Sequence, residues 1–142
     1  MKVVAIVGHH NAGKTTLIER IIPLLKEKGY RVCYLKHDPK GHGVTDKAGS
    51  DTDRISRHVS KLGLLSPTKF TFWDKEEVDL FSVLKKFFLN CDIVILEGFK
   101  NVKEIPKIAV GDVEAENVIM RVSQEVSLED IIKIIEGLEE MG

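Results

Sequence analysis

The sequence predicts an α/β fold with a mainly parallel central sheet. Its apolar residues alternate between short runs, typical of strands, and spacings of three and four, typical of helices. The most apolar of the short runs is continuous, as expected for a strand covered on both faces. The chain has no internal repeat and no low-complexity linker, and its 142 residues match the usual size of one domain. We therefore expect a single domain over residues 1–142.

Composition narrows the class of protein. With 43% hydrophobic residues, 30% charged residues and a formal net charge of -1, the chain has the composition of an ordinary globular protein, and we expect no nucleic-acid partner. The apolar run at the N-terminus is too short for a signal peptide and no run is long enough to span a membrane, which favours a cytoplasmic location. Cys33 and Cys91 have no spacing typical of zinc sites or disulfides, so we expect no disulfide and a reducing compartment.

The N-terminal part of the chain predicts a strand, a loop and a helix. Residues 2–7 are a β-branched apolar run that ends at Gly8. Residues 17–25 then carry apolar side chains at helical spacing, and Gly29 is a typical residue to follow the helix. Pro23 removes one backbone hydrogen bond within this helix, so we expect the helix to bend there and to continue.

The remaining elements follow in the same alternation. Further strands are expected at residues 31–35, 62–65, 69–73, 93–96, 107–110 and 118–122. Further helices are expected at residues 51–58, at 80–88 and after Ser127, whose side chain is placed to cap a C-terminal helix. The most apolar strand, 93–96, should be central in the sheet, and residues 36–50, which contain three glycines, should form a long surface loop.

The strongest functional signal directly follows the first predicted strand. The segment Gly8-His9-His10-Asn11-Ala12-Gly13-Lys14-Thr15 matches the phosphate-binding loop (P-loop) pattern G-x-x-x-x-G-K-[ST], between a strand and a helix. The alternative is a glycine-rich turn with a solvated lysine. The pattern predicts the three-layer fold of P-loop NTPases, with Lys14 on the terminal phosphates and Thr15 on Mg²⁺. The predicted nucleotide-binding residues are Gly8, Asn11, Ala12, Gly13, Lys14, Thr15 and Thr16.

A second signal is the carboxylate that follows the apolar strand at residues 93–96. Ligands gather at the carboxyl ends of strands in open α/β sheets, and Glu97 stands at such an end. We therefore expect Glu97 to meet Mg²⁺ together with Thr15, and to act with Lys14 in any catalysis. The alternative is a surface carboxylate that ends a strand.

A third group of polar residues follows the second predicted strand. Asp38 is a further candidate ligand for the metal, and the sequence does not distinguish it from Asp46 or Asp51. A zinc site formed by His37, Asp38 and His42 is a weaker alternative, because histidines and acids in such a loop are more often simply solvated.

Four motifs occur in order along residues 1 to about 110. They are residues 8–16, Lys36-His37, Gly49-Ser50-Asp51-Thr52, and Glu97-Gly98-Phe99-Lys100 with Pro106-Lys107-Ile108. In this combination the sequence resembles the MobB family of molybdopterin-guanine dinucleotide biosynthesis proteins. The resemblance implies a homodimeric GTP-binding protein with slow Mg²⁺-dependent hydrolysis, which assists a MobA-type guanylyltransferase, with molybdopterin as a further candidate partner. Gly13, Lys14, Thr15 and Glu97 match the family's phosphate, Mg²⁺ and acid positions.

The sequence departs from the family pattern in four places. Where the family has a histidine-rich stretch after Lys-His, this chain has Asp38-Pro39-Lys40-Gly41-His42. Ala12 replaces a serine, Ser50 replaces a lysine, and few residues follow the strand expected at 107–110. No Asn-Lys-x-Asp motif occurs, so the expectation of guanine rests on the resemblance alone. Two other functions stay open: a P-loop small-molecule kinase, which the five unclustered arginines disfavour, and a binding module switched by nucleotide.

Overall fold

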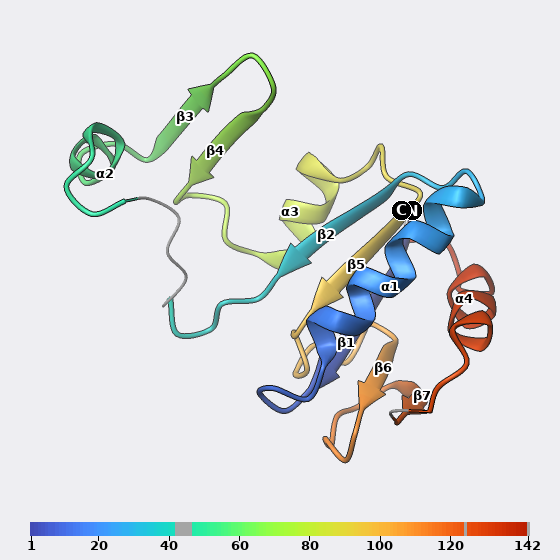
Figure 1. The fold of residues 1–142 in the computed structure, drawn as a ribbon. Coiled ribbons are helices and arrows are strands. Elements are labelled where there is room, and N and C mark those ends of the chain that lie inside the picture. The colour runs from blue at the N-terminus through green and yellow to red at the C-terminus, as the bar shows by residue number, and fades with distance from the viewer. Residues whose placement is uncertain (42–46, 124, 142) are drawn as a thin grey trace. The chain divides into compact units, whose positions relative to one another are not determined.

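The structure is a computed structural model that describes residues 1–41, 47–123 and 125–141. The chain forms two compact units (Figure 1). The first, here called the sheet unit, comprises Met1–His37 and Phe88–Gly142, and the second, the hairpin unit, comprises Asp38–Phe87. Compact units are not necessarily independent folding domains, so the expectation of a single domain stays a prediction. No helix in the described part of the chain is long and apolar enough to cross a membrane.

The sheet unit is built on five strands that are parallel to their neighbours. They are β1 (Lys2–Gly8), β2 (Val32–Lys36), β5 (Ile93–Glu97), β6 (Lys107–Val110) and β7 (Val118–Val122). Their order is β2-β5-β1-β6-β7. The prediction of an α/β fold with a mainly parallel sheet is confirmed. The most apolar strand, β5, is interior and buried throughout, although β1 occupies the middle of the sheet.

Two helices of the sheet unit, α1 (Lys14–Glu27) and α4 (Leu128–Glu136), pack against each other on one face of the sheet (Figure 1). Alternate residues of the strands meet apolar side chains of both helices in one core, because successive strand residues point to opposite faces. Helix α1 continues through Pro23, as predicted. Ser127 caps α4 by accepting a hydrogen bond from the backbone N–H of Asp130, which is also as predicted.

The two cysteines form a disulfide, so the expectation of unpaired thiols was wrong. Cys33 lies in β2 and Cys91 lies just before β5, with 6.0 Å between their Cα atoms. The two strands are neighbours in register, with Val32 opposite Ile93, and this pairing brings together cysteines that are 58 positions apart in sequence. Spacing along the chain carries no information about such a contact, because it depends on the sheet order.

A buried lysine ties together two loops of the sheet unit. The side chain of Lys107, on β6, has no exposed surface, and its ammonium donates hydrogen bonds to the carbonyls of Val102, Ile105 and Glu116. These bonds use all three donors of the ammonium group. Burial lowers the pKa of Lys107, and the three carbonyls compensate for the lost hydration.

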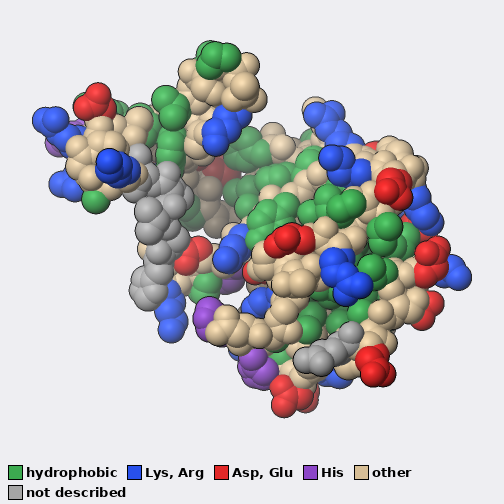
Figure 2. Space-filling view, viewed as in Figure 1, with side chains coloured by type: hydrophobic (Ala, Val, Ile, Leu, Met, Phe, Trp, Pro, Cys, Tyr) green, Lys and Arg blue, Asp and Glu red, His purple; other side chains and the backbone are tan. Residues whose placement is uncertain are grey.

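The hairpin unit contains the remaining elements. They are α2 (Asp51–Ser56), β3 (Lys61–Leu65), β4 (Phe70–Asp74) and α3 (Leu80–Phe87). The two strands pair antiparallel, and the Phe72 ring on β4 lies 6.1 Å from the Phe87 ring on α3. Hydrophobic side chains reach the surface of the hairpin on the face seen in Figure 2. Each element was predicted within two or three residues of its bounds.

Candidate functional site

The P-loop lies between the end of β1 and the start of α1. Gly13 has φ 98° and Asn11 has φ 61°, so the loop makes two left-handed turns before the helix begins. Gly8 is required for a different reason: a Cβ at this position would come within 3.0 Å of the Val110 carbonyl on β6. The glycines of the motif therefore allow both the wrapping of the loop and its close approach to the neighbouring strand.

The loop presents positive charge to the space that it encloses. The residue before α1 is Gly13, which has no capping side chain, and the first turn of α1 has no acidic residue. The first amide groups of α1 and the positive end of the helix dipole are thus available to an anion. The Lys14 ammonium lies across the loop and donates to the Gly8 carbonyl at 2.9 Å. This bond holds the lysine where it can exchange a carbonyl for a phosphate oxygen.

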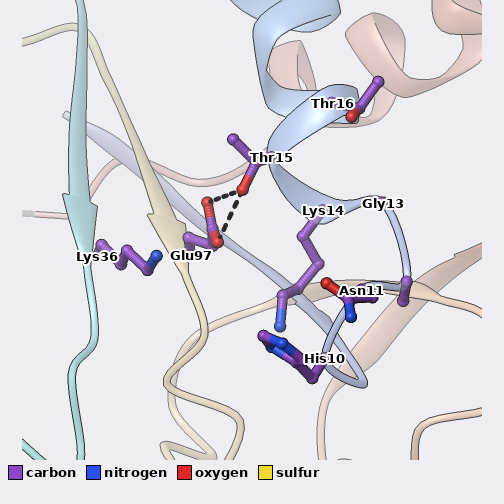
Figure 3. A pocket seen from close by; sticks show the side chains of 9 residues that line it. His10, Asn11, Gly13, Lys14, Thr15, Thr16, Lys36 and Glu97 are labelled. Atoms are coloured by element: carbon purple, nitrogen blue, oxygen red, sulfur yellow. Dashed lines mark hydrogen bonds between the residues drawn. The ribbon is translucent and has the colours of Figure 1, made fainter. Parts of the chain in front are cut away.

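Glu97 is buried at the carboxyl end of β5, next to the start of α1. Only 5% of the residue is exposed, and the Thr15 hydroxyl lies 3.1 Å from each carboxylate oxygen (Figure 3). The Tyr34 hydroxyl, on β2, donates to Oε1 at 2.8 Å. Although Tyr34 is 41% exposed, partial desolvation of its hydroxyl and the hydrogen bond to Glu97 raise the pKa of that hydroxyl above its usual range, so it acts as a donor.

The chain turns sharply after Glu97, which fixes the end of β5. Gly98 and Phe99 both have positive φ, at 92° and 61°. A Cβ on Gly98 would lie 3.2 Å from the Cβ of His37, whose ring stacks on that of Phe99 with 4.5 Å between centroids. His37 also donates its backbone N–H to the Glu97 carbonyl at 3.0 Å. The ends of β2 and β5 are therefore held together beside the carboxylate.

A cavity of about 390 Å³ joins these features. Its lining consists of His10, Asn11, Ala12, Gly13, Lys14, Thr15, Thr16, Lys36 and Glu97. The structure thus brings together every predicted nucleotide-binding residue except Gly8, and it places Glu97, the predicted acid, with them. Gly8 contributes its carbonyl, which accepts the hydrogen bond from Lys14. Asp38 belongs to the hairpin unit and is not among the lining residues, while Asp46 and His42 lie outside the described residues. A role for Asp38 at the metal stays a prediction.

A second cavity, of about 690 Å³, shares the P-loop as one wall. Beyond the loop it is lined by α1 and by the carboxyl ends of β6 and β7. Its residues are Asn11, Ala12, Gly13, Thr16, Leu17, Arg20, Val110, Gly111, Val122, Ser123 and Val126. His9 Nε2 lies 3.2 Å from a carboxylate oxygen of Asp112, an exposed contact between the P-loop and the loop after β6. The second cavity has the size and the mixed lining of a site for a small organic group.

Sequence reasoning did not predict Tyr34 as a site residue, and it noted Lys36 only as part of the Lys36-His37 motif. Tyr34 and Lys36 lie two positions apart on β2, so their side chains are on the same face of the strand. Lys36 is the register partner of Glu97, and its side chain points toward Glu97 (Figure 3). The signal in the sequence was two side chains with polar ends, Tyr34 and Lys36, at alternate positions near the carboxyl end of a predicted strand. This pattern indicates a site only when β2 is known to pair with β5, the strand that carries Glu97.

The oxygen donors of the site suit a hard cation. Mg²⁺ prefers carboxylate, hydroxyl and phosphate oxygens, and the Thr15 hydroxyl and the Glu97 carboxylate lie in contact at the edge of the phosphate cavity. Within the described residues no group of three or more His, Cys, Asp or Glu side chains is arranged to hold a metal ion by itself. A cation here would therefore share its ligands with a bound phosphate group, as Mg²⁺ commonly does. The alternative zinc site is not tested, because His42 lies outside the described residues.

The comparisons with known proteins agree with this geometry. A family model described as MobB, molybdopterin guanine dinucleotide synthesis protein B, matches residues 3–136. The chain belongs to the MobB family. Among its relatives, a protein of Methanocaldococcus jannaschii named as a molybdopterin-guanine dinucleotide biosynthesis adapter is 32% identical over 146 residues, which cover 95% of this chain and 61% of the relative.

A curated relative and a solved structure, both from Bacillus subtilis, extend the comparison. A curated relative named as a molybdopterin-guanine dinucleotide biosynthesis adapter is 36% identical over 118 residues, 76% of this chain and 64% of the relative. The crystal structure of Bacillus subtilis MobB matches with a TM-score of 0.75 at 21% identity, covers 96% of this chain and 99% of that one, and supports the fold. The chain thus spans somewhat less than two thirds of the length of the two curated relatives.

Proposed function

We propose that this MobB-family protein binds Mg²⁺-GTP at its P-loop and acts as an adapter in molybdopterin-guanine dinucleotide biosynthesis. The observation that carries the proposal is the meeting of Lys14, Thr15 and Glu97 around one cavity, at the carboxyl ends of adjacent parallel strands. The names of the curated relatives support the pathway, and the P-loop supports the ligand.

The residues of the phosphate cavity have separate tasks in this proposal. The amides of the loop and of the first turn of α1 bind phosphate oxygens, and Lys14 exchanges the Gly8 carbonyl for the terminal phosphates. Thr15 and Glu97 hold Mg²⁺, which would offset the negative charge of the phosphates. Lys36 adds a second positive charge to the same space. A polyphosphate is the ligand class that this balance of charges favours.

The nucleoside belongs in the second cavity. That cavity begins at the P-loop residues that also line the phosphate cavity, so one ligand can extend from one to the other. Its volume of about 690 Å³ lies within the usual range for small-ligand sites. The choice of guanine over other bases is supported by the family alone.

Hydrolysis should be slow. The phosphate cavity has no arginine among the described residues that line it, and P-loop GTPases without an arginine at the phosphates turn over at about 10⁻⁴ to 10⁻³ per second. In this proposal Lys14 and Glu97 provide what catalysis there is. In this proposal a partner of the MobA type raises the rate of hydrolysis by adding positive charge around the phosphates. Molybdopterin is the proposed further ligand of the complex with that partner.

Equilibrium binding of a fluorescent guanine nucleotide with Mg²⁺ tests the proposal. GTP should compete more strongly than ATP or CTP, and Lys14→Ala should weaken binding by tenfold or more, on the order of one charge-assisted hydrogen bond. Lys26→Ala is the matched control, because Lys26 lies in the last turn of the same helix. Equal binding by the parent and Lys14→Ala would remove the basis of the proposal, and equal competition by all three nucleotides would remove the guanine assignment.

The oligomeric state and the location are further parts of the proposal. We propose a homodimer, which sedimentation with and without nucleotide would test, and a cytoplasmic site of action stays a prediction.

Binding of GTP without hydrolysis, alone or with a MobA-type partner, would favour a nucleotide-switched binding module over a weak GTPase. Transfer of phosphate from ATP to a small acceptor, followed by mass spectrometry, would instead favour a kinase.

A further inference from the structure

The two hydroxyls that contact Glu97 differ in what they can do to its carboxylate. Thr15 Oγ1 lies 3.1 Å from both oxygens, so its single proton does not distinguish one oxygen from the other. Tyr34 contacts Oε1 alone, at 2.8 Å. Of these two contacts only the second is asymmetric, and only it can set the rotation of the carboxylate about its terminal bond, a torsion that is otherwise broad.

The two carboxylate oxygens of Glu97 differ in how much of their capacity to accept hydrogen bonds is used. A carboxylate oxygen accepts about two hydrogen bonds. Among the described residues, Oε1 has hydrogen-bond contacts with both Thr15 and Tyr34, whereas Oε2 has such a contact with Thr15 only. Since Glu97 is 5% exposed, little solvent reaches the remaining acceptor site. Oε2 is therefore the oxygen with capacity for a further partner in the phosphate cavity that Glu97 lines.

The strand that carries Tyr34 is held firmly against β5. β2 is one of the two edge strands of the sheet and, within the described residues, pairs with β5 alone. The disulfide from the residue next to Tyr34, Cys33, to Cys91, just before β5, ties this strand to the start of β5. Tyr34 pairs with Ile95 and Lys36 with Glu97, so the tyrosine reaches diagonally along the sheet to the carboxylate. A diagonal contact of this kind depends on the strand register and is well defined only if the register is fixed.

We propose that Tyr34 is a positioning residue for the metal site, whose hydroxyl turns Glu97 so that Oε2 is the acceptor for Mg²⁺ or for a water bound to it. The inference rests on the proposed binding of Mg²⁺-nucleotide and names a residue that acts on it through Glu97. Partners that orient a metal-binding carboxylate commonly change metal affinity by about ten- to a hundredfold when removed.

Another tyrosine in the sheet unit provides a matched control. The Tyr30 hydroxyl donates to Glu136 Oε2 at 2.7 Å, a bond of the same chemistry and similar length. Neither Tyr30 nor Glu136 lines the phosphate cavity or the second cavity. Tyr30→Phe therefore removes an equivalent hydrogen bond without touching the proposed site.

The experiment measures binding of the fluorescent guanine nucleotide as Mg²⁺ is titrated, and again in EDTA, for the parent, Tyr34→Phe and Tyr30→Phe. We expect Tyr34→Phe to raise the Mg²⁺ concentration at half-saturation about tenfold, while its affinity in EDTA changes less than about twofold. Tyr30→Phe should match the parent in both conditions. Thermal melting of each variant checks that the fold is intact.

A double variant tests whether Tyr34 acts through Glu97. In a Glu97→Gln background, Tyr34→Phe should change half-saturation by less than about twofold, because the group that it orients has been altered. Three results would each overturn the inference while leaving the proposed function in place. The first is a Mg²⁺ concentration at half-saturation that Tyr34→Phe does not change, and the second is nucleotide binding that Tyr34→Phe weakens equally with Mg²⁺ and in EDTA. The third is an effect of Tyr34→Phe that is as large in the Glu97→Gln background as in the parent. Binding by the parent that is indifferent to Mg²⁺ would overturn both.

Discussion

The two units of the chain differ in how they bury apolar side chains. Among the described residues, every buried hydrophobic residue but Leu84 belongs to the sheet unit. In the hairpin unit, Leu65 is 81% exposed and Phe70 is 63% exposed. Both units have apolar strands, so composition does not separate them. The difference follows from packing, because α1 and α4 pack apolar side chains onto a face of the five-stranded sheet, whereas β3 and β4, in the described part of the chain, form a sheet of two strands only. Stability is therefore concentrated in the unit that carries the candidate site.

The largest expected effect compares one apolar residue from each unit. Ile95→Ala, in the buried strand β5, should lower the free energy of unfolding by about 4 kcal/mol, because it removes apolar contacts and leaves a cavity in the core. Leu65→Ala, in β3, should change it by less than about 0.5 kcal/mol, since its side chain is mostly exposed. Urea unfolding of both variants measures the two values. Similar losses from the two substitutions would show that the units share the stability more evenly than burial indicates.

The disulfide should have the next largest effect. It joins Cys33 to Cys91 and so closes the loop of chain that contains the whole hairpin unit. For a separation of 58 residues, loss of the cross-link should cost up to about 4 kcal/mol, mainly through the added freedom of the unfolded chain. Unfolding of the parent with and without a reductant, compared with the Cys33→Ser, Cys91→Ser double variant, tests this. The reductant should not affect the double variant, and a parent that is equally stable when reduced would contradict the prediction.

Much of the fold could be predicted from the sequence because it depends on local patterns. β6 and β7 have the predicted bounds, and the cap of α4 by Ser127 follows from its distance to the first apolar residues of the helix. The P-loop could be recognised for the same reason, since the motif is continuous in sequence and its strand and helix are adjacent to it. Glu97 required one further step, the rule that ligands gather at the carboxyl ends of parallel strands.

Two of the features that could not be predicted depend on which strands are neighbours. The Cys33–Cys91 disulfide and the contact from Tyr34 to Glu97 both cross from β2 to β5, and nothing local in either segment identifies its partner. The buried position of Lys107 was not predicted because a lysine is rarely buried unless its ammonium is paired, and here the partners are three loop carbonyls that no local pattern identifies.

The third prediction compares a buried lysine of the sheet unit with an exposed lysine of the hairpin unit. Lys107→Met should cost about 2 kcal/mol, because it leaves three carbonyls without their donor. Lys75→Met should cost less than about 0.5 kcal/mol, since the single carbonyl partner of Lys75 is that of Ser56 and the bond is exposed. Chemical denaturation of both variants at neutral pH gives the two values, and equal losses would contradict the comparison.

The pH dependence of the same variant has a defined sign. Burial places the pKa of Lys107 in the folded protein below the value near 10.5 that a free lysine has, so the unfolded chain binds more protons between these two values. The parent should therefore gain stability relative to Lys107→Met as pH rises through that window. Unfolding measured at several alkaline pH values checks the slope, and a loss of relative stability over this range would contradict burial as the main influence on this lysine.

The smallest expected effect concerns the two helices that begin with a serine cap. Ser127 accepts from Asp130 N–H in α4, and Ser50 accepts from Asp53 N–H in α2. Ser127→Ala should lower the global free energy of unfolding by about 1 kcal/mol, because α4 buries three isoleucines in the core and cannot fray without exposing them. Since α2 buries no residue, Ser50→Ala should loosen that helix alone, with a change in the global free energy of unfolding below about 0.5 kcal/mol.

Native-state hydrogen exchange separates the results for the two serine caps. In Ser50→Ala, faster exchange should be confined to α2, and only in Ser127→Ala should the slowest-exchanging amides shift. An equal shift of those amides in both variants would mean that the hairpin unit unfolds together with the sheet, despite its exposed apolar surface.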